Sequence, residues 1–337
     1  MSISDKSFWR EVKRPIKVLA PMAGYTDSAF RIICRQFGAD VVMTELVSAD
    51  AIAFSKFKVE KSDGKTKAIS TKNKTTAEML SFSDEERPLV IQLFGKYPEK
   101  FALAAKWISD NLKPDGIDIN MGCPARKVVG SDHGAALLKN PDLACEIVRA
   151  VKENTNLPIS VKTRLGWDSD DQILEFGPKM ISAGAEVLII HGRTYKHGFS
   201  GEARWENIYK LKEIVGDNIV IGNGDIKSIF DLERRINGVI DGRNITLDGA
   251  AIGRATFGKP WIFTQNTDNR IQITALKKTI LDHARLAFED KGDKGIIEFR
   301  KHLLAYLKGF PGSKALRIVA TKIENLNDIE QILSHIV

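Results

Sequence analysis

Short apolar runs alternate along the chain with longer amphipathic stretches. The runs are rich in Val, Ile and Leu, and each but the last is followed by apolar residues at three- and four-residue spacing, which is typical of helices. The runs cover residues 17–20, 41–43, 89–93, 117–119, 159–161, 187–190, 219–221 and 250–252. Strict alternation of strand and helix predicts a parallel sheet, and eight such units over about 250 residues predict a closed (β/α)8 TIM barrel.

The positions just after these runs favour the barrel over an open, doubly wound sheet. Nearly every run ends in polar residues or glycine, at 21–24, 44–45, 92–95, 120–123, 162–164, 191–193, 222–224 and 253–254. In a barrel all of these ends meet on one face, whereas an open sheet spreads them along an edge. The sequence therefore predicts an α/β barrel whose site lies at the carboxyl ends of its strands.

Beyond Trp261 the alternation stops and the pattern becomes wholly helical. Apolar residues recur at helical spacing in 280–288, 296–307 and 316–323. We therefore expect a catalytic barrel over residues 1–265 and a small all-helical domain over residues 266–337. Polar insertions at 56–74 and 239–247 are predicted to be exposed loops, and the first of them is expected to be mobile.

Composition narrows the class of protein. Cys34, Cys123 and Cys145 are too few and too far apart for a disulfide framework or a zinc site, and no metal motif is present, so we expect no metal. No apolar run approaches the ~20 residues that cross a bilayer. The polar start does not resemble a signal peptide, so we expect a cytoplasmic protein without membrane contact. The formal net charge of +7 permits a polyanionic partner.

Two glycine-bearing strand ends predict a phosphate site. Asn223 and Gly224 follow the seventh run, and Gly253 and Arg254 follow the eighth. Barrel enzymes commonly bind phosphate there, because glycine lets backbone N–H groups approach the anion and arginine adds charge-assisted hydrogen bonds. A glycine after a strand more often marks only a turn, but two such ends on adjacent strands favour the phosphate.

Lys162 and His191 also stand at strand ends. An unpaired ammonium in a barrel mouth is costly, so Lys162 needs a partner. It could neutralise an anionic flavin, hold a phosphate, form a Schiff base, or only pair with Glu45. His191 is either a satisfied core histidine or part of the site, and its place before Gly192 and Arg193 favours the site.

Gln92, Asn120 and Cys123 suggest a flat ligand. The two amides both donate and accept hydrogen bonds, which suits the edge of a heterocycle. Cys123 follows a strand that Pro124 prevents from continuing. Its thiol could act as a general acid or as a nucleophile, or it could be inert, as buried cysteines often are.

Together these motifs resemble the signature set of the tRNA-dihydrouridine synthases. The likeness runs from about Ile16 to the C-terminus, and the cysteine motif is its most specific part. The segments that carry it are 20–27 (APMAGYTD), 92–95 (QLFG), 118–124 (DINMGCP), 161–166 (VKTRLG), 191–193 (HGR), 223–225 (NGD) and 252–254 (IGR). The residues after Cys123 are most similar to the bacterial B-type branch, although Asp132 and His133 depart from the more basic or glycine-rich loop expected there.

The resemblance implies an FMN-containing barrel that reduces the C5–C6 double bond of particular uridines in tRNA with NADPH. Asn120 would seat the uracil, and Cys123 would be the general acid that protonates C5 after hydride reaches C6. The flavin and its phosphate would be held by Pro21, Met22, Ala23, Gln92, Lys162, His191, Asn223, Gly224, Gly253 and Arg254.

The helical region is consistent with a tRNA partner. Residues 299–323 contain basic side chains and no acidic ones. Such a run is often only a solvated face, but an enzyme that flips a uridine out of folded tRNA must grip the surrounding backbone. A single chain would suffice to bind one tRNA, so we expect the protein to be a monomer. We expect tRNA contacts from Arg126, Lys127, Arg300, Lys301, Lys308 and Arg317.

Three other interpretations compete. A flavin barrel that acts on a free pyrimidine would not need the basic helices. A Schiff-base lyase built on Lys162 would leave Cys123 and Asn120 without a role. An RNA-binding protein that has lost catalysis would have no reason to keep Cys123, Lys162 and His191 at strand ends.

Overall fold

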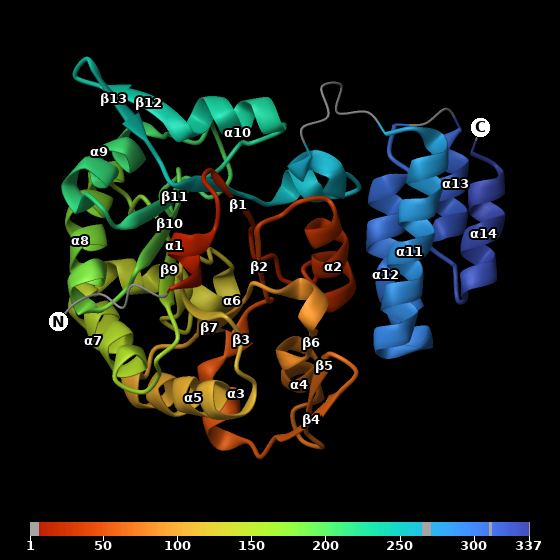
Figure 1. Ribbon diagram of the computed structural model, residues 1–337, viewed down its shortest axis with the longest axis horizontal. Coiled ribbons are helices and arrows are strands. Elements are labelled where there is room, and N and C mark those ends of the chain that lie inside the picture. Colours follow the sequence, from red (N-terminus) through yellow and green to blue (C-terminus); the bar gives the residue numbers. More distant parts are fainter. Residues whose placement is uncertain (1–6, 265–270, 310–311, 337) are drawn as a thin grey trace.

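Eight parallel strands form a closed barrel, and the outer helices surround it (Figure 1). The computed structural model describes residues 7–264, 271–309 and 312–336. Pairing of the second barrel strand with the third closes the circle, so the predicted TIM barrel is confirmed. The barrel strands are β1 (Ile16–Leu19), β2 (Val41–Met43), β7 (Leu89–Phe94), β8 (Gly116–Met121), β9 (Ile159–Arg164), β10 (Val187–His191), β11 (Ile219–Asn223) and β14 (Gly249–Ile252).

Helices follow the strands and cover the outside of the barrel. The start of α2 is capped by Asp27, which accepts the backbone N–H of Phe30, and prolines occupy the first turns of α5 and α7. Within the described residues, no helix is both long and apolar enough to span a membrane. The outer helices are α2 (Ser28–Gln36), α3 (Ala49–Phe54), α5 (Pro98–Asn111), α7 (Pro141–Lys152), α8 (Ile173–Ala183), α9 (Glu206–Val215) and α10 (Ile229–Ile236).

The interior of the barrel is apolar at its amino-terminal end. Side chains alternate between the two faces of a strand, so Ile189 of β10 and Ile221 of β11 point inward while Leu188 and Val220 pack against the outer helices. Trp9, on the short helix α1 (Phe8–Glu11), is buried in the same interior cluster. Within the part of the chain that the structure describes, this packing fills the amino-terminal end of the barrel interior.

The two insertions are largely exposed, as predicted, but they form hairpins, so the prediction that they are loops was wrong. The first contains β4 (Lys58–Ser62) and β5 (Lys65–Ile69), extended by β6 (Phe82–Ser83) after α4 (Lys74–Leu80). The second contains β12 (Asn237–Ile240) and β13 (Arg243–Thr246). Each turns on an Asp-Gly pair with positive φ, at 63–64 and 241–242, which is the geometry of a tight two-residue hairpin loop.

In the part of the chain that the structure describes, four α-helices follow the barrel, and the first of them, α11, packs against α2 (Figure 1). They are α11 (Ile273–Lys291), α12 (Asp293–Tyr306), α13 (Ser313–Ala320) and α14 (Leu326–Ser334). The helices share an apolar core of their own, which includes Phe299 and Leu303 and reaches Ala29 of α2. The predicted all-helical region is thus confirmed, whereas the predicted boundary at 265–266 lies outside the described residues.

Candidate active site

A cavity of about 480 Å³ opens at the carboxyl ends of the barrel strands. Its size lies in the range of about 300–1,000 Å³ that is typical of small-molecule sites. The structure brings every barrel residue predicted for flavin or uracil to the wall of this cavity. These residues are Pro21, Met22, Ala23, Gln92, Asn120, Cys123, Lys162, His191, Asn223, Gly224, Gly253 and Arg254.

The alternation of strand side chains explains why these groups converge. Gln92, His191 and Asn223 stand two residues beyond Val90, Ile189 and Ile221, which point inward. His191 and Asn223 are the last residues of their strands, and Gln92 lies two residues before the end of β7. The apolar interior therefore gives way to polar groups at one level.

A chain of hydrogen bonds runs from the floor of this cavity to the cysteine loop. Asp118, buried on β8, accepts the Ser160 hydroxyl at 2.6 Å and Gln92 Nε2 at 2.6 Å. Gln92 Oε1 then accepts Asn120 Nδ2 at 3.0 Å, and Asn120 Oδ1 accepts the backbone N–H of Cys123 at 3.0 Å. A carboxylate can only accept, so Asp118 determines which way each amide points. We call Asp118, Gln92 and Asn120 the amide relay.

Burial shifts the pKa values of the two charged groups deepest in the cavity. It raises the pKa of Asp118, against the hydrogen bonds from Ser160 and Gln92 and the attraction of Lys162. Burial likewise lowers the pKa of Lys162, against the attraction of Asp118. The two groups thus stabilise each other's charged forms in a site that otherwise disfavours charge.

Lys162 does not pair with Glu45, so that suggested partner was wrong. Its ammonium donates to Asn223 Oδ1 at 3.1 Å, and Asn223 in turn donates to the backbone carbonyl of Ala251 at 2.7 Å. Glu45 instead accepts the backbone N–H of Gly24 in the loop after β1. Lys162 therefore stays in the cavity, where a bound anion can reach it.

One ring nitrogen of His191 is free to bind a ligand. Its Nδ1 is buried and has no hydrogen-bond partner within the described residues. Burial lowers the pKa of the imidazole well below its usual value, and the nearby cations Lys162, Arg164 and Arg193 lower it further. The ring is therefore neutral near pH 7, and its nitrogens can donate to or accept from a bound heterocycle.

Two residues that the sequence analysis did not assign complete the cavity wall. Arg164 is buried and donates to the carbonyls of Gly122 and Gly198, both at 2.8 Å, which joins the cysteine loop to the loop after β10. Phe199 in that second loop is 53% exposed, and its ring centroid lies 4.5 Å from Cζ of Arg254. Arg164 ends a strand beside Lys162, which was a usable signal, whereas Phe199 lies in a loop without periodicity.

The loop after β10 is also fixed from its other side. Arg193 forms an ion pair with Asp225, with Nη2 2.8 Å from Oδ2, and Asp225 accepts the backbone N–H of Ala203 at 2.7 Å. Gly224 adopts a φ of +127°, and a Cβ there would approach Cβ of Ala203 to 2.7 Å. A side chain at Gly224 would push this loop away from the cavity.

The residues predicted to contact tRNA fall into two groups. Arg126 and Lys127 on α6 (Arg126–Val129), Lys308 after α12 and Arg317 on α13 are all exposed. In contrast, Arg300 donates to the backbone carbonyl of Ile323 through Nε at 2.9 Å and Nη2 at 2.6 Å. Lys301 Nζ lies 3.6 Å from Oδ2 of Asp27. Arg300 and Lys301 thus already have partners within the protein.

Comparison with known proteins supplies the family. The family model described as "Dihydrouridine synthase (Dus)" matches residues 18–63 and 65–337. A probable tRNA-dihydrouridine synthase of Aquifex aeolicus is 35% identical over 321 residues, with 93% of each chain covered. The tRNA-dihydrouridine synthase B of Pseudomonas syringae pv. tomato is 33% identical, and the alignment covers 91% of this chain and 87% of the relative.

A solved structure supports the fold alone. A 2-naphthoyl-CoA reductase matches 74% of this chain and 49% of its own with a TM-score of 0.50, at 9% sequence identity. The matches to the family model and to the curated relatives extend through both the barrel and the helices that follow it. This chain therefore belongs to the dihydrouridine synthase family.

Proposed function

We propose that this protein is a tRNA-dihydrouridine synthase that uses FMN and NADPH to reduce the C5–C6 double bond of uridines in tRNA. The observation that carries the proposal is the placement of Cys123 on the wall of the same cavity as Lys162, Arg164 and His191. A thiol proton donor, two cations and a neutral imidazole thus surround one space large enough for a heterocyclic cofactor and a base.

The residues of the cavity fit FMN. The unpartnered Nδ1 of His191 offers a hydrogen bond to a ring system, and the Lys162 ammonium offers a countercharge. Gly224, Gly253 and Arg254 line the cavity at the ends of β11 and β14, where backbone N–H groups and a guanidinium can bind a phosphate. When bound and reduced by NADPH, FMN supplies the hydride that C6 of uracil receives.

Cys123 would complete the reduction by giving its thiol proton to C5. One hydride at C6 and one proton at C5 saturate the double bond and leave a thiolate at Cys123. Lys162 and Arg164 are the cations that would stabilise this thiolate, and Arg164 already contacts Gly122, the preceding residue. The amide relay would hold the cysteine loop in place while Asn120 seats the base.

The exposed basic residues would bind tRNA around the flipped uridine. Arg126 and Lys127 follow the cysteine loop directly, and their side chains have no partner within the described residues. Phe199 offers an exposed aromatic face at the mouth, on which a base can stack. Arg300 and Lys301 would contribute only by giving up their present partners.

One experiment tests the proposal as a whole. Purified protein is examined for a flavin absorbance spectrum, and NADPH oxidation is then followed with unmodified tRNA, with free uridine and with neither. We expect a yellow protein, oxidation that depends on tRNA, and tRNA that gains two hydrogens per modified uridine by mass spectrometry. Equal oxidation with free uridine would instead support a pyrimidine dehydrogenase. A protein that FMN cannot reconstitute would support the Schiff-base lyase.

We also propose that α11–α14 form a separate tRNA-binding domain and that the protein acts as a cytoplasmic monomer. The apolar core shared by these helices supports the division. Light scattering of the protein with and without tRNA tests the monomer, because a dimer would double the mass of the free protein.

A further inference from the structure

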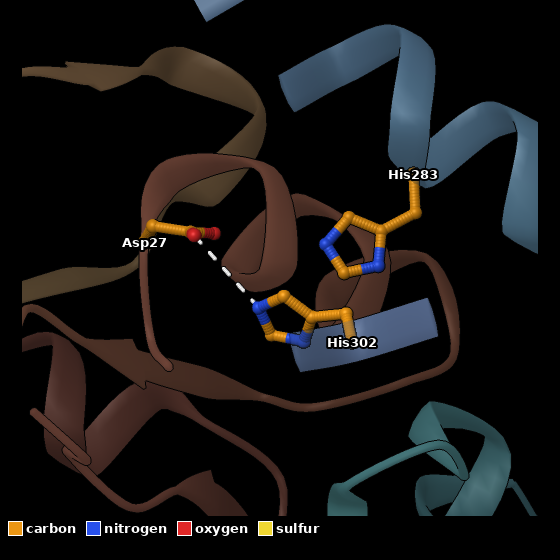
Figure 2. A group of neighbouring side chains, drawn as sticks. All are labelled: Asp27, His283 and His302. Atoms are coloured by element: carbon orange, nitrogen blue, oxygen red, sulfur yellow. Dashed lines mark ion pairs between the residues drawn. The ribbon is translucent and has the colours of Figure 1, made fainter. Parts of the chain in front are cut away.

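Two buried histidines and an aspartate meet where the barrel contacts the helical region. Asp27 lies in the loop between β1 and α2, His283 lies on α11, and His302 lies on α12 (Figure 2). Figure 2 shows the two imidazole rings and the carboxylate facing a common point. One ligand atom from each residue lies within 4.8 Å of the others. We call these three residues the junction cluster.

The two imidazoles are unusual because each has a buried nitrogen without a partner. His283 Nε2 and His302 Nε2 make no hydrogen bond within the described residues, although both side chains are almost fully buried. The nearest approach of His302 Nε2 to Asp27 Oδ2 is 3.8 Å, which is too long for a hydrogen bond. Buried polar atoms without partners are rare and costly, so these two call for a ligand.

The outer atoms of the cluster are held as those of metal ligands usually are. His283 Nδ1 lies 3.1 Å from the Tyr306 hydroxyl, which leaves Nε2 facing the cluster. Asp27 Oδ1 accepts the backbone N–H of Phe30 at 3.0 Å, which leaves Oδ2 facing it. Such outer contacts orient metal-binding imidazoles and carboxylates. Burial also lowers the pKa of both imidazoles, and the neutral form is the one that binds metal.

We propose that Asp27, His283 and His302 bind one divalent transition-metal ion, with zinc as the best match, that joins the barrel to the helical region. Two nitrogens and one carboxylate oxygen suit zinc, whose bonds to such atoms are about 2.0–2.2 Å long. Ligand atoms of a tetrahedral zinc lie about 3.4 Å apart, so these atoms, which now lie within 4.8 Å of one another, must approach by up to about 1.4 Å on binding. The expectation of no metal came from motif spacing, and these ligands come from three separate segments.

Lys301 opposes the metal. Its ammonium lies 3.6 Å from the same Asp27 oxygen that would bind the ion, so the two cations compete for one carboxylate. The Lys301 side chain is 27% exposed and has room to swing toward solvent. Metal binding should therefore release Lys301 from Asp27, which would free a predicted tRNA contact.

Metal binding would also affect the loop between β1 and α2, part of which lines the cavity. The metal site itself does not depend on the proposed function. Met22 lines the cavity, and its backbone N–H donates to Oγ1 of Thr26, the residue before Asp27. An ion on Asp27 would thus anchor one end of the loop that forms the cavity wall.

The test measures zinc binding to the protein as purified, with or without bound flavin. The protein is first treated with a chelator, and the chelator is then removed. Zinc is titrated against a chromophoric competitor, and bound zinc is measured by elemental analysis. We expect one zinc ion per chain in the wild type. Changes in the outer contacts of a metal ligand weaken binding by about 10- to 100-fold. His283→Gln and His302→Gln remove a ligand itself, so each should weaken zinc binding by more than this.

Two further variants keep the test decisive. His335→Gln removes an exposed histidine far along the chain on the turn after α14 and should bind zinc as the wild type does. Lys301→Met should bind zinc more tightly than the wild type, and it tests the site even when a histidine variant does not fold. The proposal is overturned when the wild type shows no saturable binding, when His302→Gln and His335→Gln bind equally, or when Lys301→Met does not change the affinity.

Discussion

Asp118 in the barrel mouth is buried, and Asp27 at the junction with the helices is partly buried, but the two aspartates differ in their partners. Asp118 in the mouth is held by a hydroxyl and an amide, and burial raises its pKa to about 6. Burial also raises the pKa of Asp27 at the junction, but His302 and Lys301 outweigh it and bring that pKa well below its usual value. The comparison shows that the neighbours, and not burial alone, decide whether an aspartate stays charged.

The largest effect is expected from replacing Cys123, the proposed proton donor in the barrel mouth. Cys123→Ala should lower kcat by about 10²- to 10⁴-fold, because that is the usual contribution of a general acid. Flavin binding should persist, since the loop is held through the backbone N–H of Cys123. Single-turnover reduction of tRNA measures the rate.

Cys145→Ala is the matched control for this loss. Its thiol lies on the outer helix α7, 3.8 Å from the backbone carbonyl of Lys179. Wild-type rates in Cys123→Ala, or an equal loss in Cys145→Ala, would remove Cys123 from the reaction.

Arg254 tests the phosphate side of the mouth. Arg254→Met should weaken FMN binding by about 10- to 100-fold, because a hydrogen bond to a charged group contributes about 1.5–3 kcal/mol. Flavin fluorescence during dilution measures the release. Arg243→Met, on the exposed hairpin β12–β13, should leave release unchanged, and equal release from both variants would contradict the phosphate role.

Asp118 tests whether the amide relay needs an obligate acceptor. Asp118→Asn should lower kcat by about tenfold with little change in KM, because an amide in its place no longer fixes the direction of the Gln92 side chain. Ser160→Ala removes the other partner of Asp118 but leaves the relay intact, so its effect should be smaller. An equal loss in both variants would mean that Asp118 only supports packing.

The pH dependence of stability should have opposite signs in the two regions. A raised pKa means that the folded protein binds the Asp118 proton more tightly, so this group stabilises below about pH 4 and loses that contribution as pH rises through about 6. Asp27 has a lowered pKa, so its contribution is present above about pH 4 and is lost in acid. Urea unfolding of Asp118→Asn and Asp27→Asn from pH 3 to 7 should show these opposite differences from the wild type, and parallel curves would refute them.

The smallest effect is expected at the exposed basic face. Lys308→Ala should raise the KM for tRNA by a few-fold and reduce the slope of log binding against log salt by about 1, as for one lost phosphate contact. Lys106→Ala on the outer helix α5 is the control. Unchanged salt dependence in Lys308→Ala would remove this residue from the tRNA surface.

The sequence predicted the barrel because its signal is local. Each apolar run became a strand, and the residues after the runs converged because strand ends in a closed parallel barrel share one face. The hairpins were missed even though Asp63-Gly64 and Asp241-Gly242 are strong turn signals, because the lysine-rich, polar composition around the first is also typical of a solvated loop.

Contacts between distant segments were harder to predict. The partner of Lys162 is Asn223, two strands away around the barrel, and only the register of the sheet brings them together. The position of Asp118 in the site could have been predicted from the sequence, because Asp118 and Asn120 are two residues apart and share the inward face of β8. The junction cluster was not, because its residues come from the barrel and from two helices far along the chain.

Arg164 has a consequence for how the mouth opens. Its guanidinium binds the carbonyls of Gly122 and Gly198, so neither loop can leave the cavity without breaking the same side chain's contacts. The two loops should therefore unfold locally as one cooperative unit, with their amide protons exchanging together. Access to the cavity would then be governed by a single opening equilibrium.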